Sequence, residues 1–291
     1  MQNDPITDEI INYYNSVTGV GYSKLQAITS AIPQGEYYDF KYYLLNTFYW
    51  SRKSSKIIWE IFQSFVTDPV DNLLDFGCGS GLYTKRLSGY CKNYIGTDIS
   101  NTGLEIAREI NHSLENAAYI NLDTFNKLKT SFDLIFCSET LDHIENTEET
   151  LRKLKSVLKP GGKIIITTTT MYHYLFRILL QRIPSDIANK NFKIALRRLL
   201  VFMQALFDFT KRGDLMRIGL DRDDHVNAFT LKQHNYLAKK VGLYVHDYEY
   251  FNCKSIFPGK FFEPLNNLLK KILRRSKVYG PNIVVVLKSC E

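Results

Sequence analysis

The chain has 291 residues, a formal net charge of +7 and five cysteines. This length can bury a full hydrophobic core and predicts one α/β domain with helical additions. The odd cysteine count and the lack of any Cys-x-x-Cys pair argue against a disulfide framework and against a structural zinc site. The N-terminus lacks the features of a signal peptide, and no apolar run reaches the roughly 18–20 residues of a membrane span, so we expect a cytoplasmic protein.

Residues 1–70 form an aromatic-rich segment, with eight tyrosines between Tyr13 and Tyr49. Apolar residues recur at helical spacing near its end, which predicts a helix that runs up to Asp68-Pro69. The residues on this stripe are Ile58, Ile61, Phe62 and Phe65. We therefore expect a helical N-terminal cap over residues 1–70.

The most informative stretch is residues 73–81, Leu-Leu-Asp-Phe-Gly-Cys-Gly-Ser-Gly, where an apolar run ends in a loop of small residues. Glycines let the backbone approach a ligand closely, and the start of the following helix offers free N–H groups. Asp98 closes the next apolar run, and a carboxylate there can accept both hydroxyl protons of a ribose. The combination predicts a nucleotide-like binding site.

Strand and helix patterns alternate beyond this loop. We expect strands two to five at residues 94–98, 118–123, 132–137 and, after the turn at Pro160-Gly161, up to 166. A helix over 149–158 places Leu151, Leu154 and Leu158 on one stripe. The regular pattern then stops and resumes at Phe229, where Thr230 caps a helix that ends near Gly242. Strands six and seven are expected at residues 243–245 and 282–287. The predicted organisation is a core over 71–170, an insertion over 171–225 and the C-terminal part of the core over 226–291.

The glycine loop of this chain does not match the motifs of other protein classes that have glycine-rich loops. A nicotinamide-binding loop reads G-x-G-x-x-G, whereas this one reads G-x-G-x-G. A phosphate-binding P-loop needs Gly-Lys-Ser/Thr, and a nucleophile elbow needs G-x-S-x-G; neither motif is present.

The stretch from about Asn72 to Thr170 resembles the class I S-adenosylmethionine-dependent methyltransferases, in particular the small-molecule and quinone-biosynthesis-like "methyltransferase type 11" group. The glycine loop, the acid after strand two, and the segments "SETLDHIEN" and "LKPGGKIIIT" occur in family order and spacing. The resemblance implies a Rossmann-like α/β fold with a seven-stranded sheet of order 3-2-1-4-5-7-6. Strand 7 is then antiparallel, helices precede the sheet, and a helical insertion follows strand 5. It also implies an enzyme whose methyl donor is S-adenosylmethionine and whose product is S-adenosylhomocysteine.

This resemblance assigns the loop residues to the amino-acid end of the donor. Asp75, Gly77 and Gly79 are expected to surround that end, whose ammonium favours carbonyl or carboxylate oxygens. Cys78 belongs to the same loop, and Gly81 eases the entry into the first helix.

The nucleoside end of the donor is assigned to the next two strands. Asp98 is expected to bind the ribose hydroxyls, and Ile99 to cover one face of the adenine. Asp123 can accept a hydrogen bond from the adenine amino group, with Thr124 beside it. The alternative role for Asp123 is a helix cap.

Methyl transfer depends largely on positioning, because the sulfonium is already a strong electrophile. Cys137 and Ser138 end strand four and are expected below the methyl-bearing sulfur. A hydroxyl acceptor still needs a base, and the candidates are His143 and His225. The alternative roles are helix packing and cofactor enclosure for His143, and bracing of a loop for His225.

Several acceptor classes and a metal site are disfavoured. The residues after strand four do not match the segment of amino-methylating DNA enzymes, and Cys137 lacks the neighbouring proline of a cytosine-methylating nucleophile. Carboxylates are present near both histidines, but their spacing indicates no metal site. They are Glu139, Asp142, Glu145, Asp223 and Asp224.

Two basic segments carry the positive charge of the chain. Residues 171–217 have nine Lys and Arg against three Asp, and residues 254–277 have seven against one Glu. Apolar residues recur at helical spacing within the first segment, and a basic amphipathic helix is expected near 260–276. The first stripe consists of Phe192, Ala195, Leu196, Leu199, Met203 and Leu206. Such helices either form a lid packed on the core or lie on an anionic membrane, whereas nucleic acid is disfavoured because the tyrosines cluster elsewhere.

The sequence thus favours a methyltransferase that acts on a small or lipid-like molecule, with oxygen as the favoured target. One alternative is a peripheral membrane methyltransferase of a quinone or isoprenoid lipid. Another is a catalytically silent, methyltransferase-like interaction subunit, although the intact loop and Asp98 argue against it.

Overall fold

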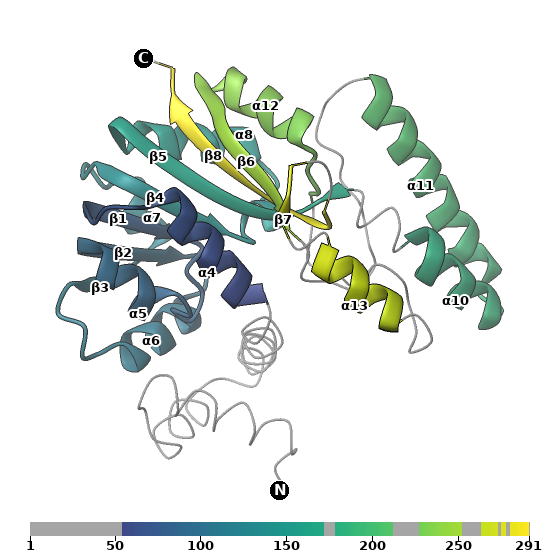
Figure 1. The fold of residues 1–291 in the computed structure, drawn as a ribbon, viewed down its shortest axis with the longest axis horizontal. Coiled ribbons are helices and arrows are strands. Elements are labelled where there is room, and N and C mark those ends of the chain that lie inside the picture. Colours follow the sequence, from purple (N-terminus) through teal and green to yellow (C-terminus); the bar gives the residue numbers. More distant parts are fainter. Residues whose placement is uncertain are drawn as a thin grey trace, which may run out of the picture. The chain divides into compact units, whose positions relative to one another are not determined.

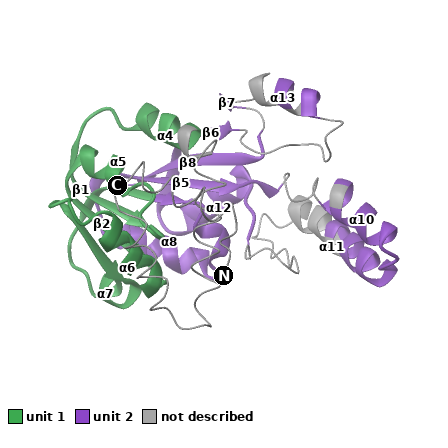
Figure 2. Ribbon diagram, turned by 90° about the horizontal axis from the view of Figure 1, so that it is seen from below, with its two compact units in different colours: residues 1–136 green, residues 137–291 purple. Residues whose placement is uncertain are grey.

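The structure is a computed structural model, and it describes residues 54–171, 178–211, 227–251, 263–272, 275–277 and 280–290. The strands follow the order β3-β2-β1-β4-β5-β8-β6-β7. The order expected from the sequence is confirmed, because β8 takes the place of strand seven and β7 is a short additional edge strand. The chain divides into two compact units, residues 1–136 and 137–291 (Figure 2), which are described separately.

The first unit contains parallel strands covered by short helices (Figure 1). Its strand β1 pairs with β2 and with residues 134–136 of β4, and β2 pairs with β3, all in parallel. Leu73 and Leu74 lie next to each other in β1 and are both 0% exposed, as expected for a parallel strand that is buried on both faces. The elements are α4 (Ser54–Phe65), β1 (Val70–Phe76), α5 (Thr84–Leu87), β2 (Cys91–Asp98), α6 (Asn101–Ile110), β3 (Ala117–Asn121) and α7 (Leu122–Asn126).

Strand β3 ends earlier than the sequence predicted. The side chain of Asn121 accepts a hydrogen bond from the backbone N–H of Thr124 at 3.0 Å and so caps helix α7. The prediction of a strand through Asp123 is therefore wrong, because this cap turns the chain into a helix that buries Phe125. The cap itself is Asn121, so Asp123 does not play the alternative role of helix cap.

The second unit is centred on an antiparallel strand. Strand β8 lies between β5 and β6 and is antiparallel to both. Six of its residues in succession, from Asn282 to Leu287, are buried, which places β8 at the core of this unit. The elements are the end of β4 (Phe132–Ser138), α8 (Thr147–Ser156), β5 (Leu158–Thr169), α10 (Ile183–Ala188), α11 (Phe192–Lys211), α12 (Leu231–Lys240), β6 (Leu243–Phe251), α13 (Glu263–Ile272), β7 (Arg275–Ser276) and β8 (Asn282–Ser289).

Helix α12 begins where the sequence predicted. The hydroxyl of Thr230 accepts from the backbone N–H of Gln233 at 3.2 Å, and the Gln233 side chain accepts from the Thr230 N–H at 2.8 Å. This reciprocal capping box satisfies two helix-end donors. By contrast, α8 ends at Ser156, so Leu158 lies in β5 rather than on the predicted helical stripe.

The insertion leaves the sheet and returns to it at one place. Thr170 forms an isolated parallel bridge with Phe229, and the backbone N–H of Met171 donates to the Phe229 carbonyl at 3.1 Å. Between these points the structure describes a π-helical turn at Ile178–Arg182 together with α10 and α11. The ends of the segment are thus held by backbone hydrogen bonds.

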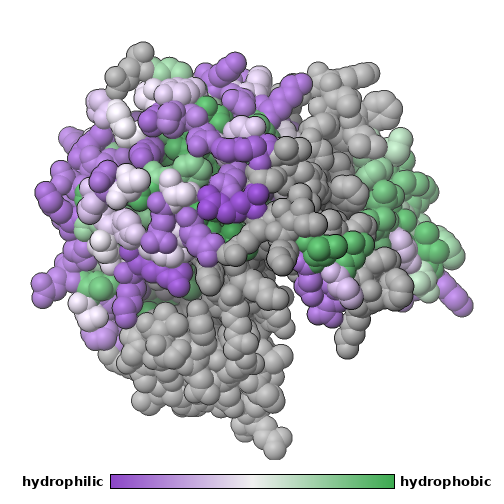
Figure 3. All heavy atoms as spheres, viewed as in Figure 1, coloured by the Kyte–Doolittle hydropathy of each residue, from purple (hydrophilic) through white to green (hydrophobic). Residues whose placement is uncertain are grey.

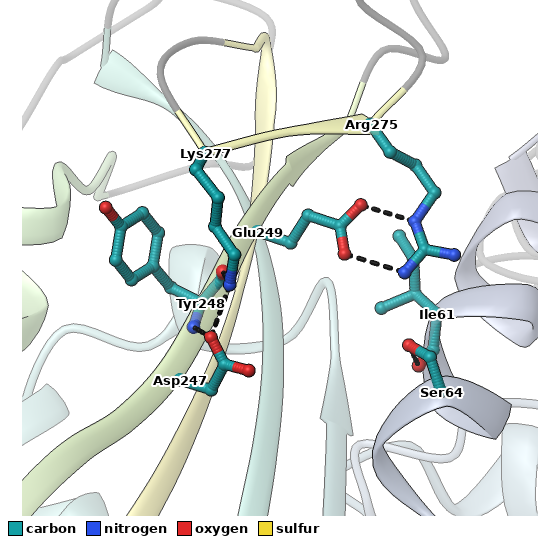
Figure 4. Close-up of polar contacts among 7 residues, drawn as sticks. All are labelled: Ile61, Ser64, Asp247, Tyr248, Glu249, Arg275 and Lys277. Atoms are coloured by element: carbon teal, nitrogen blue, oxygen red, sulfur yellow. Dashed lines mark hydrogen bonds and ion pairs between the residues drawn. The ribbon is translucent and has the colours of Figure 1, made fainter.

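The outer edge of the sheet is held by charged pairs (Figure 4). Arg275 of β7 binds the carboxylate of Glu249 through two nitrogens, with Nη2 at 2.7 Å from Oε2. Lys277 donates to the carboxylate of Asp247 and to the carbonyl of Tyr248. A bidentate guanidinium contact of this kind fixes the geometry of a strand that is only two residues long.

Candidate donor-binding site

The glycine loop after β1 is held in a conformation that favours glycine. Gly77, Gly79 and Gly81 have φ angles of 80°, 53° and 76°, a region that other residues rarely adopt. The backbone N–H groups of Gly77 and Cys78 both donate to the Thr97 carbonyl, at 2.8 and 3.0 Å. The loop is therefore tied to the end of β2, beside Asp98.

Asp98 joins the loop to the start of the next helix. Its Oδ2 accepts from the backbone N–H of Gly79 at 2.8 Å, and its Oδ1 accepts from the N–H of Ser100 at 2.9 Å. Each carboxylate oxygen can accept more than one hydrogen bond, so these two contacts do not exclude a contact with a ligand. This geometry is compatible with the predicted ribose contact, and Ile99, the next residue, is 80% exposed.

Asp75 lies beneath the loop rather than on an open surface. Its side chain is 2% exposed and its Oδ2 accepts a hydrogen bond from the Tyr94 hydroxyl at 2.8 Å. Burial raises the pKa of Asp75 to about 7, the Tyr94 hydrogen bond lowers it, and the charge of Asp98 raises it further. A direct contact with the donor stays a prediction, whereas the partnership with Tyr94 is a feature that sequence reasoning missed.

Asp123 and Thr124 are exposed residues in the first turn of α7. The Thr124 backbone N–H is occupied by the cap from Asn121, while both side chains face solvent. Their predicted place near the adenine stays a prediction.

The residues at the end of β4 belong to the second unit. Cys137 is 0% exposed, and the Ser138 hydroxyl lies 2.9 Å from the hydroxyl of Thr167. The next residue, Glu139, has a φ of 51°, which is rare for a residue with a side chain. Its N–H donates to the Thr167 carbonyl at 2.8 Å and its carboxylate accepts from Thr169 at 3.3 Å. These contacts fix the chain as it leaves the sheet.

The two predicted catalytic histidines differ in how much the structure says of them. His143 is an exposed residue at the end of a short helical turn, with its N–H bonded to the Thr140 carbonyl at 3.0 Å. His225 lies outside the described residues. A general-base role for either residue stays a prediction.

A third histidine, His234 of α12, is buried and was not singled out from the sequence. It is 2% exposed, stacks on Phe229 at 4.8 Å, and places Nε2 3.2 Å from the Thr168 hydroxyl. Burial lowers its pKa to about 3, against a smaller opposing effect of the Asp142 charge. The sequence feature that pointed to His234 is the capping motif at Thr230, because this motif places residue 234 in the first turns of a helix that packs on the sheet.

We expect His234 to make the protein sensitive to acid. Its folded-state pKa lies below the unfolded value of about 6.5, so its contribution is complete above that pH and is lost as the pH falls toward 3. By pH 4.5 the loss reaches about 2–3 kcal/mol. Urea unfolding at pH 7 and pH 4.5 should show a smaller loss for His234→Gln than for the wild type. His246→Gln, an exposed substitution in β6, is the matched control, and an equal loss in all three proteins would refute the assignment.

The part of the chain that the structure describes contains no cluster of three or more His, Cys, Asp or Glu residues suited to a metal ion. Within the same residues, no helix combines the length and apolar character needed to cross a bilayer.

Most of the chain matches the profile of a known protein family. Residues 49–248 match a family profile described as a methyltransferase domain. An uncharacterized methyltransferase of Schizosaccharomyces pombe is 34% identical over 106 residues, which cover 33% of this chain and 37% of that protein. A ubiquinone biosynthesis O-methyltransferase of Coxiella burnetii is 29% identical over 102 residues, covering 33% of this chain and 43% of the relative. The aligned region thus spans less than half the length of either curated relative.

Solved structures share the fold at low identity. A S-adenosylmethionine-dependent methyltransferase from Clostridium acetobutylicum has a TM-score of 0.50 at 16% identity, covering 81% of this chain and 91% of that one. A second such enzyme, from Mesorhizobium loti, has the same score and identity, with coverage of 79% and 97%. At this identity the likeness shows the fold.

Proposed function

The chain belongs to the methyltransferase-domain family, and on that premise we propose that it transfers a methyl group from S-adenosylmethionine to an oxygen of a small or lipid-like acceptor. The observation that carries the proposal is the hydrogen bond between Asp98 and the Gly79 N–H. It holds the carboxylate that we propose to bind the ribose against a loop whose three glycines have positive φ angles. A site with this geometry needs little rearrangement to bind a nucleoside.

The donor supplies the electrophile, because the methyl carbon is bonded to a positively charged sulfur. When the acceptor oxygen attacks, the carbon–sulfur bond breaks and S-adenosylhomocysteine leaves as a neutral thioether. The acceptor hydroxyl must also lose its proton, for which His143 is the described candidate. The O-methyltransferase activity named for the Coxiella burnetii relative supports oxygen as the target.

Calorimetric titration with S-adenosylhomocysteine tests the donor half of the proposal. We expect binding with one ligand per chain, and the absence of measurable heat over a range of temperatures would refute it. If the protein is instead a catalytically silent subunit, it should bind S-adenosylhomocysteine but show no methyl transfer. Incubation with labelled donor and a panel of phenolic and prenylated hydroxy compounds separates these two functions.

A second candidate, a peripheral membrane methyltransferase, is favoured by the exposed face of α11. Most described residues of the predicted apolar stripe are exposed, Phe192 by 63% and Leu196 by 58%, whereas Ala195 is buried. Leu200, one turn after Leu196 and outside the predicted stripe, is 61% exposed as well. Figure 3 shows the apolar side chains gathered over the helices of the insertion. Lys193 and Arg197 flank this face and are also exposed. An apolar stripe beside basic residues has the chemistry of a helix that lies on an anionic bilayer.

Sedimentation with phosphatidylglycerol vesicles at low and high salt tests this candidate. We expect the wild type to bind at low salt and Leu196→Ser/Leu200→Ser to lose binding. We also expect Lys193→Gln/Arg197→Gln to bind roughly 30-fold more weakly, from about 1 kcal/mol per basic residue. Tyr244→Ser, an exposed aromatic substitution in β6, is the control. Equal sedimentation of all variants, or none at low salt, would exclude membrane docking through α11.

A further inference from the structure

Four side chains form a continuous hydrogen-bonded chain beneath the glycine loop. The Tyr119 hydroxyl donates to Thr84 Oγ1 at 2.9 Å, and Thr84 donates to the Tyr94 hydroxyl at 2.9 Å. Tyr94 in turn donates to Asp75 Oδ2 at 2.8 Å. The four residues come from β3, α5, β2 and β1, and none is more than 9% exposed.

Each hydroxyl in this hydrogen-bonded chain donates its single proton toward Asp75. The last acceptor is a carboxylate, and a hydrogen bond to an ionised oxygen is about twice as strong as a neutral one. At the other end, the Asn111 amide donates to the Ala107 carbonyl at 3.0 Å and to the Gly81 carbonyl at 3.5 Å. The ionised acceptor at the Asp75 end therefore sets the direction of the hydrogen bonds.

The groups around Asp75 otherwise oppose its charge. Burial and the nearby Asp98 carboxylate both raise the pKa of Asp75. The Cys78 thiol is buried as well, and its pKa is raised well above the usual value, so it supplies no charge. The Arg108 guanidinium donates to the Tyr119 carbonyl at 2.9 Å rather than to the carboxylate. The hydroxyl of Tyr94 is therefore the group that favours the carboxylate form.

Packing around β2 connects the hydrogen-bonded side chains to the glycine loop. At Gly96, a Cβ atom would lie 2.9 Å from Cys78 Sγ and 2.9 Å from a ring carbon of Tyr119. Because Gly96 has no side chain, the Cys78 sulfur and the Tyr119 ring can both approach this position of β2. A residue of the glycine loop and a residue of the hydrogen-bonded chain thus pack against the same residue of β2, Gly96.

We propose that Tyr94 is a positioning residue for donor binding, which keeps Asp75 as an oriented carboxylate beneath the part of the loop that receives the donor's ammonium. The inference rests on the proposed function. A buried carboxylate attracts a cation more strongly than an exposed one, because the surroundings screen the charge less. Thr84 and Tyr119 order the Tyr94 hydroxyl, so their effect is in the same direction and smaller.

The test is the pH dependence of S-adenosylhomocysteine binding between pH 6 and pH 9. Wild-type affinity should rise as Asp75 ionises near pH 7. A hydrogen bond to a charged group contributes about 1.5–3 kcal/mol, so Tyr94→Phe should displace this rise upward by about one to two pH units. At pH 7.5 the variant should bind about tenfold more weakly, and it should approach wild-type affinity at pH 9.

Three further variants make the result specific. Tyr119→Phe should show a smaller displacement in the same direction, and Asp75→Asn should lose the rise altogether. Tyr90→Phe is the matched control, because its hydroxyl bonds the exposed Gln63 amide at 3.0 Å, outside the chain. The titration of the ligand's own amine is common to all variants and cancels in the comparison.

The outcomes separate this inference from the function on which it rests. A Tyr94→Phe profile that coincides with the wild type overturns the positioning role alone. If the wild type binds no S-adenosylhomocysteine at any pH, the proposed function fails and the inference with it. If circular dichroism shows that Tyr94→Phe is unfolded, Tyr119→Phe becomes the test. Its pH profile of S-adenosylhomocysteine binding must then be displaced upward, and an unchanged profile overturns the positioning role.

Discussion

Replacement of Asp98 by alanine is expected to weaken S-adenosylhomocysteine binding by about 10²–10⁴-fold. The substitution removes two predicted hydrogen bonds from a carboxylate to the ribose, each worth about 1.5–3 kcal/mol. It also removes the acceptors of the Gly79 and Ser100 N–H groups, so the loop loses its link to the end of β2. Calorimetry at constant pH gives the affinity, and circular dichroism verifies that the variant is folded.

Two comparisons separate the ligand contact from the effect on the loop. Asp98→Asn keeps one oxygen acceptor of the same shape, so it should retain more affinity than Asp98→Ala. Asp123→Ala removes one predicted hydrogen bond to a carboxylate at an exposed site, so it should cost about tenfold, less than Asp98→Ala. Wild-type affinity in Asp98→Ala would contradict the assignment of the ribose site.

Replacement of Gly81 by alanine is expected to lower the free energy of unfolding by about 2–4 kcal/mol. Gly81 has a φ of 76°, and an added Cβ would lie 2.7 Å from Asn111 Nδ2 and 3.1 Å from Thr84 Oγ1. Both the backbone conformation and the lack of space thus oppose a side chain. Urea unfolding followed by circular dichroism measures the loss.

Gly89 provides the matched control for this substitution. It lies in the same unit, and an added Cβ would meet nothing within 4 Å. Gly89→Ala should therefore stay within about 0.5 kcal/mol of the wild type. Equal stability of the two variants would show that the loop conformation at Gly81 is not required for folding.

Local patterns predicted much of the fold and part of the candidate site. The spacing between the glycine loop and Asp98 depends on one strand, one turn and one helix, so it is visible in the sequence. The cap at Thr230 is equally local, since its partner Gln233 lies three residues away. The end of β3 was predicted wrongly although its signal was also local, because Asn121 can end a strand or cap a helix with the same side chain.

Contacts between distant residues were not predictable in this way. The apolar residues of α11 have helical spacing whether their face is packed or exposed, and periodicity alone does not distinguish the two. Burial of His234 in α12 likewise depends on Phe229 and on Thr168 of strand β5.

The sequence by itself determined the family and the position of the glycine loop, because both follow from motifs within short stretches, and the resemblance to that family implied the strand order. Only the tertiary structure decided what surrounds Asp75. Its partner Tyr94 is 19 residues away, and Tyr119 and Thr84 are separated by 35 residues. Such pairs meet only when parallel strands align in register, and the register depends on packing of the whole sheet rather than on any local pattern.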